Sequence, residues 1–72
     1  MKKKLIIKGM SCKHCEMRVE KSLLNLDGVK KVKVSFVKNE AIITLDQQIE
    51  NYVFFDCIKD AGYELITIEE LA

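Results

Sequence analysis

Two cysteines, Cys12 and Cys15, are the residues of this 72-residue sequence whose type and spacing can do chemistry. Their sulfur atoms can face one point in space if Cys12 lies on a loop and Cys15 lies in the first turn of a helix. Thiolates are soft ligands, which favour Cu(I), zinc or iron–sulfur centres over hard cations. Because the sequence contains no second Cys-x-x-Cys pair, a four-thiolate structural zinc site within one chain is excluded. The spacing therefore predicts a two-thiolate site, which suits Cu(I).

Both thiols must lose their protons before they bind a metal ion. A free cysteine has a pKa of about 8.5, so only a small fraction is ionised at neutral pH. The N-terminus of a helix favours the thiolate by roughly 0.3–1 kcal/mol, which is less than the value of about 1.4 kcal/mol for one pKa unit. The metal must therefore displace protons, and its apparent affinity should rise with pH.

Two side chains beside the cysteines are metal ligands by type but not by position. His14 should leave the loop in a different direction from its neighbours, because adjacent residues on a helical turn lie about 100° apart. We interpret it as a solvated loop histidine; the alternative is a group near the rim that tunes pH dependence or bridges metal in a dimer. Met10 precedes the loop, and its position favours packing into the core, where methionine fills irregular gaps.

Three more residues have roles that the sequence leaves to be tested. Ser11 is expected to be the N-cap of the helix, because its hydroxyl can accept a hydrogen bond from a free backbone N–H. Tyr63 either packs half-buried near the loop or covers the metal. Cys57 falls on the apolar face of the second predicted helix, which favours a buried core residue over a third ligand.

Apolar periodicity predicts the elements that must position the cysteines. Alternation is strictest at 30–36, and apolar residues recur at helical spacing after the Cys-x-x-Cys segment. Gly28 and Gly62 are expected to end the two helices. The order strand–helix–strand–strand–helix–strand predicts an α+β, ferredoxin-like open-faced sandwich, a four-stranded antiparallel sheet with both helices on one face. The predicted strands are 3–8, 30–36, 41–45 and 63–68, and the predicted helices are 14–26 and 50–61.

Composition indicates one small soluble domain that spans residues 1–72. Its hydrophobic fraction is 49% and its charged fraction 32%, and a net charge of +1 gives no general attraction to nucleic acid or membrane. No apolar run reaches the roughly 7–15 residues of a secretory signal or the roughly 18 of a membrane span. Three cysteines, an odd number, argue against a disulfide scaffold. We therefore expect a cytoplasmic protein with free thiols.

The sequence resembles the heavy-metal-associated domain family, in particular its bacterial copper chaperones. The family signature Gly-Met-x-Cys-x-x-Cys after a first strand matches Gly9, Met10, Cys12 and Cys15. The resemblance covers essentially the whole chain. Further matching residues are Val19 and Leu23 in the first helix, Gly28 and Val29 after it, and Ala61, Gly62 and Tyr63 near the end.

This resemblance implies a function and a set of partners. It implies Cu(I) held nearly linearly by Cys12 and Cys15, with Ag(I) as a mimic, and delivery by ligand exchange to the metal-binding domain of a copper-transporting P-type ATPase. Cys12, the more exposed, would engage the partner first. His14 and Tyr63 match positions that surround the metal and shape access and dimerisation, so a metal-bridged homodimer is an alternative state. Ser11 stands where zinc-selective relatives often carry Asp, which favours Cu(I).

Other classes of protein share some of these sequence features. A carrier or sensor of another thiophilic metal (silver, mercury or zinc) and an ATPase fragment remain alternatives, although a periplasmic mercury-binding protein should carry an export signal. A thiol–disulfide redox protein uses the same spacing, but thioredoxin-like folds are longer and place a cis-proline at the motif, and this chain has no proline. An RNA-binding module of this topology needs aromatic residues on its strands, and 3–8 and 41–45 have none. We expect a carrier, not an enzyme.

Overall fold

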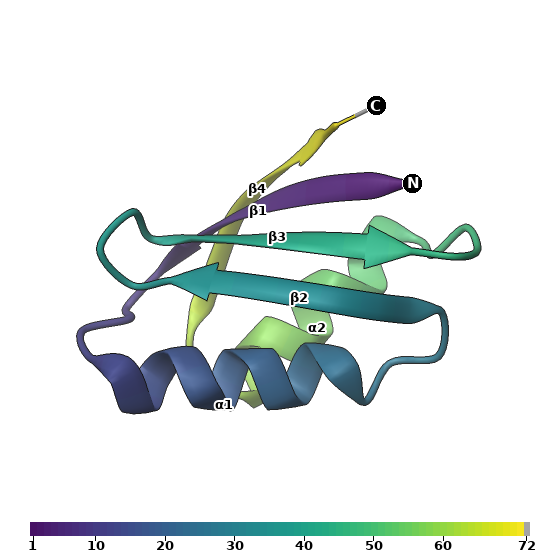
Figure 1. The fold of residues 1–72 in the computed structure, drawn as a ribbon. Helices are drawn as coiled ribbons and strands as arrows, with labels where there is room; N and C mark the ends of the chain where they lie inside the picture. Colours follow the sequence, from purple (N-terminus) through teal and green to yellow (C-terminus); the bar gives the residue numbers. More distant parts are fainter. Residues whose placement is uncertain (72) are drawn as a thin grey trace.

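The computed structural model, which describes residues 1–71, has the element order that the sequence predicts. The four strands form one antiparallel sheet in the order β2-β3-β1-β4. Both helices cover the same face of this sheet (Figure 1), so the ferredoxin-like α+β fold is confirmed. The elements are β1 (Lys2–Lys8), α1 (Lys13–Leu24), β2 (Val29–Ser35), β3 (Glu40–Leu45), α2 (Asn51–Asp60) and β4 (Glu64–Glu70).

The core lies between the sheet and the two helices. Alternate residues of β1 and β3 face the helices, because successive side chains of a strand point to opposite sides. The helices supply residues at helical spacing, Val19 and Leu23 from α1 and Phe54 and Ile58 from α2, all without solvent exposure. Each such side chain contributes about 1.5–3 kcal/mol when it is fully buried. The inward-facing strand residues are Leu5, Ile7, Ala41, Ile43 and Leu45.

The two helices end differently, and one end differs from the sequence prediction. α1 ends at Leu24 with Asn25 as its C-cap, so Gly28 lies in the turn before β2 and does not end the helix. At the end of α2 the N–H of Gly62 donates to the Lys59 carbonyl and the N–H of Tyr63 donates to the Ile58 carbonyl, both at 3.0 Å. This pair of bonds is the Schellman pattern, and the expectation that Gly62 ends α2 is confirmed.

One lysine on the helix-facing side of β1 is buried, which the sequence did not predict. Lys3 is only 4% exposed. Its Nζ donates to Asn51 Oδ1 at 2.9 Å, lies 3.4 Å from Glu70 Oε2, and sits 5.6 Å from the centre of the Phe54 ring. The aliphatic part of the side chain can therefore pack beside the core, while the ammonium group binds polar side chains at the edge of the core. This lysine connects β1 to the start of α2 and the end of β4.

Candidate metal centre

The Cys12–Cys15 segment follows a loop that a glycine makes possible. β1 ends at Lys8, and Gly9 then has a φ of +107°. This conformation is unfavourable for any residue that has a Cβ. A Cβ built on Gly9 would lie 3.4 Å from Cδ1 of Tyr63, so the loop passes close to that ring. Met10 then points into the core with 6% exposure, which confirms that it packs.

Replacing Gly9 with alanine should destabilise the protein through this loop. We expect Gly9→Ala to lower the free energy of unfolding by about 1–3 kcal/mol, the cost of holding a residue with a side chain in a sparsely populated conformation. Gly62→Ala is a matched control, because Gly62 has a φ of +97° but its added Cβ meets nothing within 4 Å. Urea unfolding gives both energies. Both variants should lose stability, because both glycines have a positive φ; full stability in Gly9→Ala together with a loss in Gly62→Ala would contradict the strain assigned to Gly9.

Cys12 lies at the start of α1 and Cys15 in its first turn. The backbone of Cys12 is extended (φ −161°, ψ 175°), and Cys12 is the N-cap residue. Its carbonyl accepts the N–H groups of Cys15 at 3.1 Å and Glu16 at 3.3 Å. The prediction of Ser11 as N-cap is therefore wrong, because the helix begins at Lys13 and Ser11 lies one residue too early. The Ser11 hydroxyl instead lies 3.9 Å from the sulfur of Cys15.

The two sulfur atoms face each other. Cys12 Sγ and Cys15 Sγ are 3.7 Å apart, well beyond the length of about 2.05 Å of a disulfide bond. Both thiols are free, with Cys12 exposed and Cys15 partly buried. With a bond of about 2.3 Å, the zinc–sulfur length, one ion can touch both sulfurs at their present separation. The arrangement thus offers a two-sulfur site, open to solvent on the Cys12 side.

The surroundings of Cys15 favour its thiolate. Hydrogen bonding to the Ser11 backbone, followed by the hydrogen bond of the Tyr63 hydroxyl, lowers the pKa of the Cys15 thiol to about 6; Cys12 adds to this effect and desolvation opposes it. The same bond to Cys15 raises the pKa of Tyr63, which stays neutral and donates at pH 7. A thiolate at neutral pH is the form that binds metal.

Alkylation should separate Cys15 from Cys57 by pH. The thiolate is the reacting form, so a pKa lowered to about 6 should make Cys15 react half-maximally near pH 6. Burial raises the pKa of Cys57, and the charge of Asp60 adds to this effect. Cys57 should therefore react only at a pH above that at which ordinary thiols ionise. Iodoacetamide modification followed by peptide mapping reads each site separately. In 8 M urea both cysteines should have the same pKa, about 8.5. If Cys57 of the folded protein reacted at a lower pH than Cys15, this assignment would be contradicted.

The other residues predicted for the site are not all beside the sulfurs. Ser11 and Tyr63 contact Cys15, as described above. His14 is exposed in the first turn of α1 and borders a shallow surface groove with Met17 and Arg18. Among residues 1–71 no group of three or more His, Cys, Asp or Glu side chains could hold a metal ion. The geometry therefore leaves two sulfurs as the candidate ligands.

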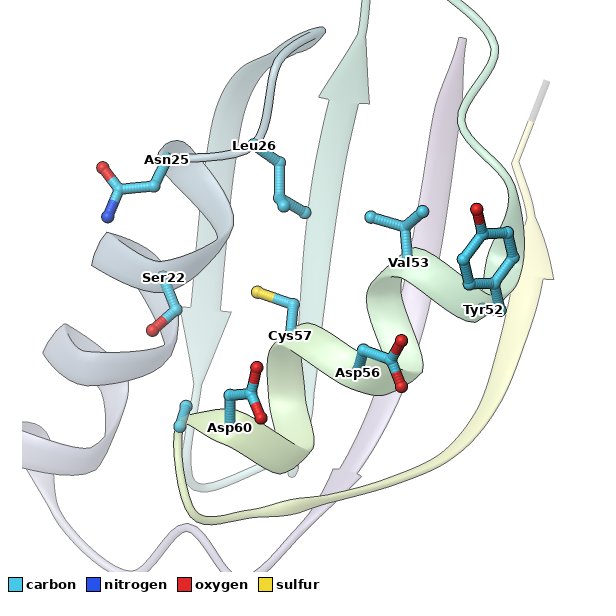
Figure 2. Close-up of a pocket in the computed structure, with 9 residues that line it drawn as sticks. Ser22, Asn25, Leu26, Tyr52, Val53, Asp56, Cys57 and Asp60 are labelled. Atoms are coloured by element: carbon cyan, nitrogen blue, oxygen red, sulfur yellow. The ribbon is translucent and has the colours of Figure 1, made fainter.

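Cys57 lies elsewhere, and its predicted burial is only partly correct. It is half-buried against the core, on the wall of a groove between α1 and α2. Figure 2 shows its sulfur pointing into the gap between these helices, toward Leu26. No residue of the 9–15 segment lines that groove. The structure thus separates Cys57 from the Cys12–Cys15 pair.

Two contacts near the site were missed in the sequence. Arg18, which lies one turn after Cys15, moderates the rise in the pKa of the Tyr63 hydroxyl. Glu16 Oε2 accepts the backbone N–H of Phe36 at 2.8 Å and so ties the first turn of α1 to the end of β2. The spacing of three between Cys15 and Arg18 placed them on one helix face, but no sequence signal indicated Tyr63 or Phe36 as partners.

Comparisons with known proteins agree with this fold and site. Residues 4–53 match the model of the heavy-metal-associated domain. The copper chaperone CopZ of Enterococcus hirae is 37% identical over 65 residues, which cover 89% of this chain and 94% of that protein. A crystal structure of a copper-binding domain from HMA7, a P-type ATPase, aligns with a TM-score of 0.81 at 34% identity, covering 100% of this chain and 96% of that one. The chain belongs to the heavy-metal-associated domain family.

A relative with a different cargo is also similar. The periplasmic component of a mercuric transport protein from Shigella flexneri is 45% identical over 60 residues, which cover 82% of this chain but 66% of that protein. The match to the copper chaperone, in contrast, extends over nearly all of both chains. Within residues 1–71, no helix is both long enough and apolar enough to span a membrane.

Proposed function

We propose that this chain is a cytoplasmic metallochaperone, acting as one domain over residues 1–72, that carries one Cu(I) ion on Cys12 and Cys15. The observation that carries the proposal is the pair of free sulfurs, which face each other at 3.7 Å at the start of α1. Two thiolates and no third ligand suit a soft monovalent ion, whereas structural zinc is held by four ligands. The copper chaperone of Enterococcus hirae, similar over most of its length, supports the same cargo.

Near-linear binding of Cu(I) requires the site to open slightly. Two sulfurs on opposite sides of an ion lie two metal–sulfur bonds apart, which is about 4.6 Å for the zinc–sulfur length of about 2.3 Å, compared with 3.7 Å here. Cys12 is exposed and its side chain is free to turn outward, whereas Cys15 is held by Ser11 and Tyr63. We therefore assign the adjustment to Cys12. Ag(I), a soft ion of the same charge, should bind in the same way.

Transfer to a partner is an exchange of sulfur ligands without a change in oxidation state. A partner thiolate attacks the bound Cu(I), which then has three sulfur ligands. The bond to Cys12 breaks first, because Cys12 is the more exposed sulfur, and the bond to Cys15 follows as a second partner thiolate binds. Each released thiolate is free to take up a proton. The similarity to a copper-binding domain of a P-type ATPase supports such a domain as the partner.

The neighbouring side chains assist this exchange in different ways. Tyr63 and Ser11 stabilise the Cys15 thiolate, and Met10 fixes the loop from the core side. His14, exposed beside the site, shapes access to the metal. Where no partner is present, a second copy of this chain can supply the attacking thiolate, which gives a metal-bridged homodimer.

A carrier of mercury is the second candidate, because a mercuric transport protein is 45% identical over the matched residues. A redox protein is the third, since the two sulfurs are near enough to join after a small movement. One experiment can distinguish a Cu(I) carrier, a mercury carrier and a redox protein.

That experiment is an anaerobic titration of the reduced protein with Cu(I) against a chromophoric chelator, with Zn(II) and Hg(II) in parallel. We expect uptake of one Cu(I) per chain in competition with the chelator, and weak binding of zinc. A protein that leaves Cu(I) on the chelator but binds mercury tightly would be a mercury carrier. Failure to bind either ion, with ready formation of a Cys12–Cys15 disulfide, would instead support the redox protein.

A further inference from the structure

Two loops lie at the same end of the sheet (Figure 1). The metal loop (residues 9–12) connects β1 to α1, and the β2–β3 loop consists of residues 36–39. Both elements beside the metal loop are hydrogen-bonded to the β2–β3 loop. The N–H of Ile7 in β1 donates to the Asn39 carbonyl at 2.8 Å. The N–H of Phe36 donates to Oε2 of Glu16 in α1, also at 2.8 Å. The β2–β3 loop therefore connects the strand before the metal loop to the helix after it.

The β2–β3 loop is itself held in place. The side chain of Phe36 is half-buried and packs against the core. Asn39 has a φ of +54°, a left-handed conformation in which asparagine is several-fold enriched. Directly after the loop, Glu40 pairs with Lys4 of β1 at 3.6 Å. A loop fixed at both of its ends can serve as an anchor for α1.

Glu16 contacts this loop and does not cap its own helix. With Cys12 as the N-cap, Glu16 is the fourth residue of α1, one position beyond the residue that reaches back to the N-cap in a capping box. No ion pair within residues 1–71 engages Glu16. Its half-buried carboxylate instead accepts the Phe36 N–H, and hydrogen bonds to an ionised acceptor are stronger than those between neutral groups.

The anchored turn also carries a metal ligand. Cys15 directly precedes Glu16, and the N–H groups of both donate to the Cys12 carbonyl. We propose that Glu16 is a positioning residue for Cu(I), which fixes the first turn of α1 to the β2–β3 loop through the Phe36 N–H. Cys15 then keeps its place while the site opens at Cys12, whose side chain is exposed. This role rests on the proposed function as a Cu(I) carrier.

Three variants separate the hydrogen bond from the negative charge. Glu16→Ala removes both, whereas Glu16→Gln keeps an oxygen acceptor on a side chain of the same length and removes only the charge. Glu20→Ala is the matched control, because it removes an exposed carboxylate one turn later in α1 that has no ion pair within residues 1–71.

Hydrogen exchange of the Phe36 amide, followed by NMR on the metal-free chains, reports the anchor. We expect the exchange to become about tenfold faster or more in Glu16→Ala, because this amide loses a bond to a charged acceptor. The acceleration should be less than about fivefold in Glu16→Gln, which still offers a neutral acceptor. Glu20→Ala should exchange at the parent rate.

Competition with a chromophoric Cu(I) chelator reports the effect on the metal. We expect Glu16→Ala to bind Cu(I) about tenfold more weakly than the parent, since removing a group that orients a ligand costs roughly 10–100-fold. Glu16→Gln should recover most of this affinity, and Glu20→Ala should stay within about twofold of the parent. Circular dichroism at the same temperature confirms that every variant is folded, so that the loss of affinity is not a loss of fold.

Several results would overturn the positioning role. A Glu16→Ala variant that is less stable in urea but binds Cu(I) as the parent does would give Glu16 a structural role only. Equal losses of affinity in Glu16→Ala and Glu16→Gln, or in Glu16→Ala and Glu20→Ala, would indicate charge and not the hydrogen bond. An unchanged exchange rate of Phe36 in Glu16→Ala would show that the anchor is absent. The proposed function fails separately, because it requires only that the parent chain competes for Cu(I).

Discussion

Replacing Cys12 or Cys15 with serine is expected to weaken Cu(I) binding by more than about 100-fold, since removing only a partner of a ligand already costs roughly 10–100-fold. A hydroxyl is a hard, neutral group at pH 7 and does not replace a soft thiolate. The two variants should also differ from each other. Cys12→Ser keeps the thiolate that Ser11 and Tyr63 stabilise, so it should retain weak, one-sulfur binding.

The control for both variants is Cys57→Ala. Cys57 lines the groove between α1 and α2, and no residue of the 9–15 segment lines this groove. Removing the Cys57 thiol should therefore leave Cu(I) affinity unchanged. Competition against a chromophoric Cu(I) chelator measures all three variants. Parent-like affinity in Cys12→Ser or Cys15→Ser would remove the site described above, and a large loss in Cys57→Ala would make Cys57 a ligand.

Replacing Phe54 with alanine should produce the largest loss of stability. Phe54 is unexposed and is the largest fully buried side chain in residues 1–71. Truncation of a buried phenylalanine costs about 3–5 kcal/mol through lost burial and the cavity left behind. A domain of this length has a total stability of roughly 4–11 kcal/mol, at 0.05–0.15 kcal/mol per residue. Phe54→Ala should therefore lose a large part of its stability, measured by urea unfolding followed by circular dichroism.

The adjacent aromatic residue provides the control. Phe55 is 42% exposed on the same helix, so Phe55→Ala should cost less than about 1 kcal/mol, as surface substitutions do. The two variants have the same change in composition and differ in burial alone. Equal losses of stability would show that α2 does not pack on the sheet through Phe54 and would contradict the described core.

Local patterns predicted most of the fold. The alternation in β3 and the helical spacing of Val19 and Leu23 each reflect one buried face, and this face can be read without knowledge of its partner. Gly62 could be predicted for the same reason, because the end of a helix depends on a few consecutive residues. Gly28 was misplaced because α1 stops at Leu24, four residues earlier. Helix ends fray, and their assigned bounds vary by one or two residues, so a single glycine does not determine where the last turn stops.

Spacing and periodicity predicted only the sequence-local part of the site, whereas the place of Tyr63 beside it came from the family resemblance. The spacing of Cys12 and Cys15 indicated that the sulfurs converge, and they lie 3.7 Å apart. The Tyr63 hydroxyl affects the pKa of the Cys15 thiol across 48 positions of sequence, and the ammonium of buried Lys3 is paired with Asn51 and Glu70. Such long-range partners follow from the topology of the sheet, not from local periodicity. The groove beside Cys57 has the same origin, because it exists only where α1 and α2 meet.

The most direct test of the account is transfer of Cu(I) from this chain to the copper-binding domain of a P-type ATPase. The loaded chain is mixed anaerobically with the apo domain, with a chelator present that captures any Cu(I) released to solution, and the two proteins are then separated and assayed for copper. We predict that copper partitions between the two proteins while little reaches the chelator. Copper that stays on the chain, or that reaches the domain only after capture by the chelator, would contradict a carrier that works by ligand exchange.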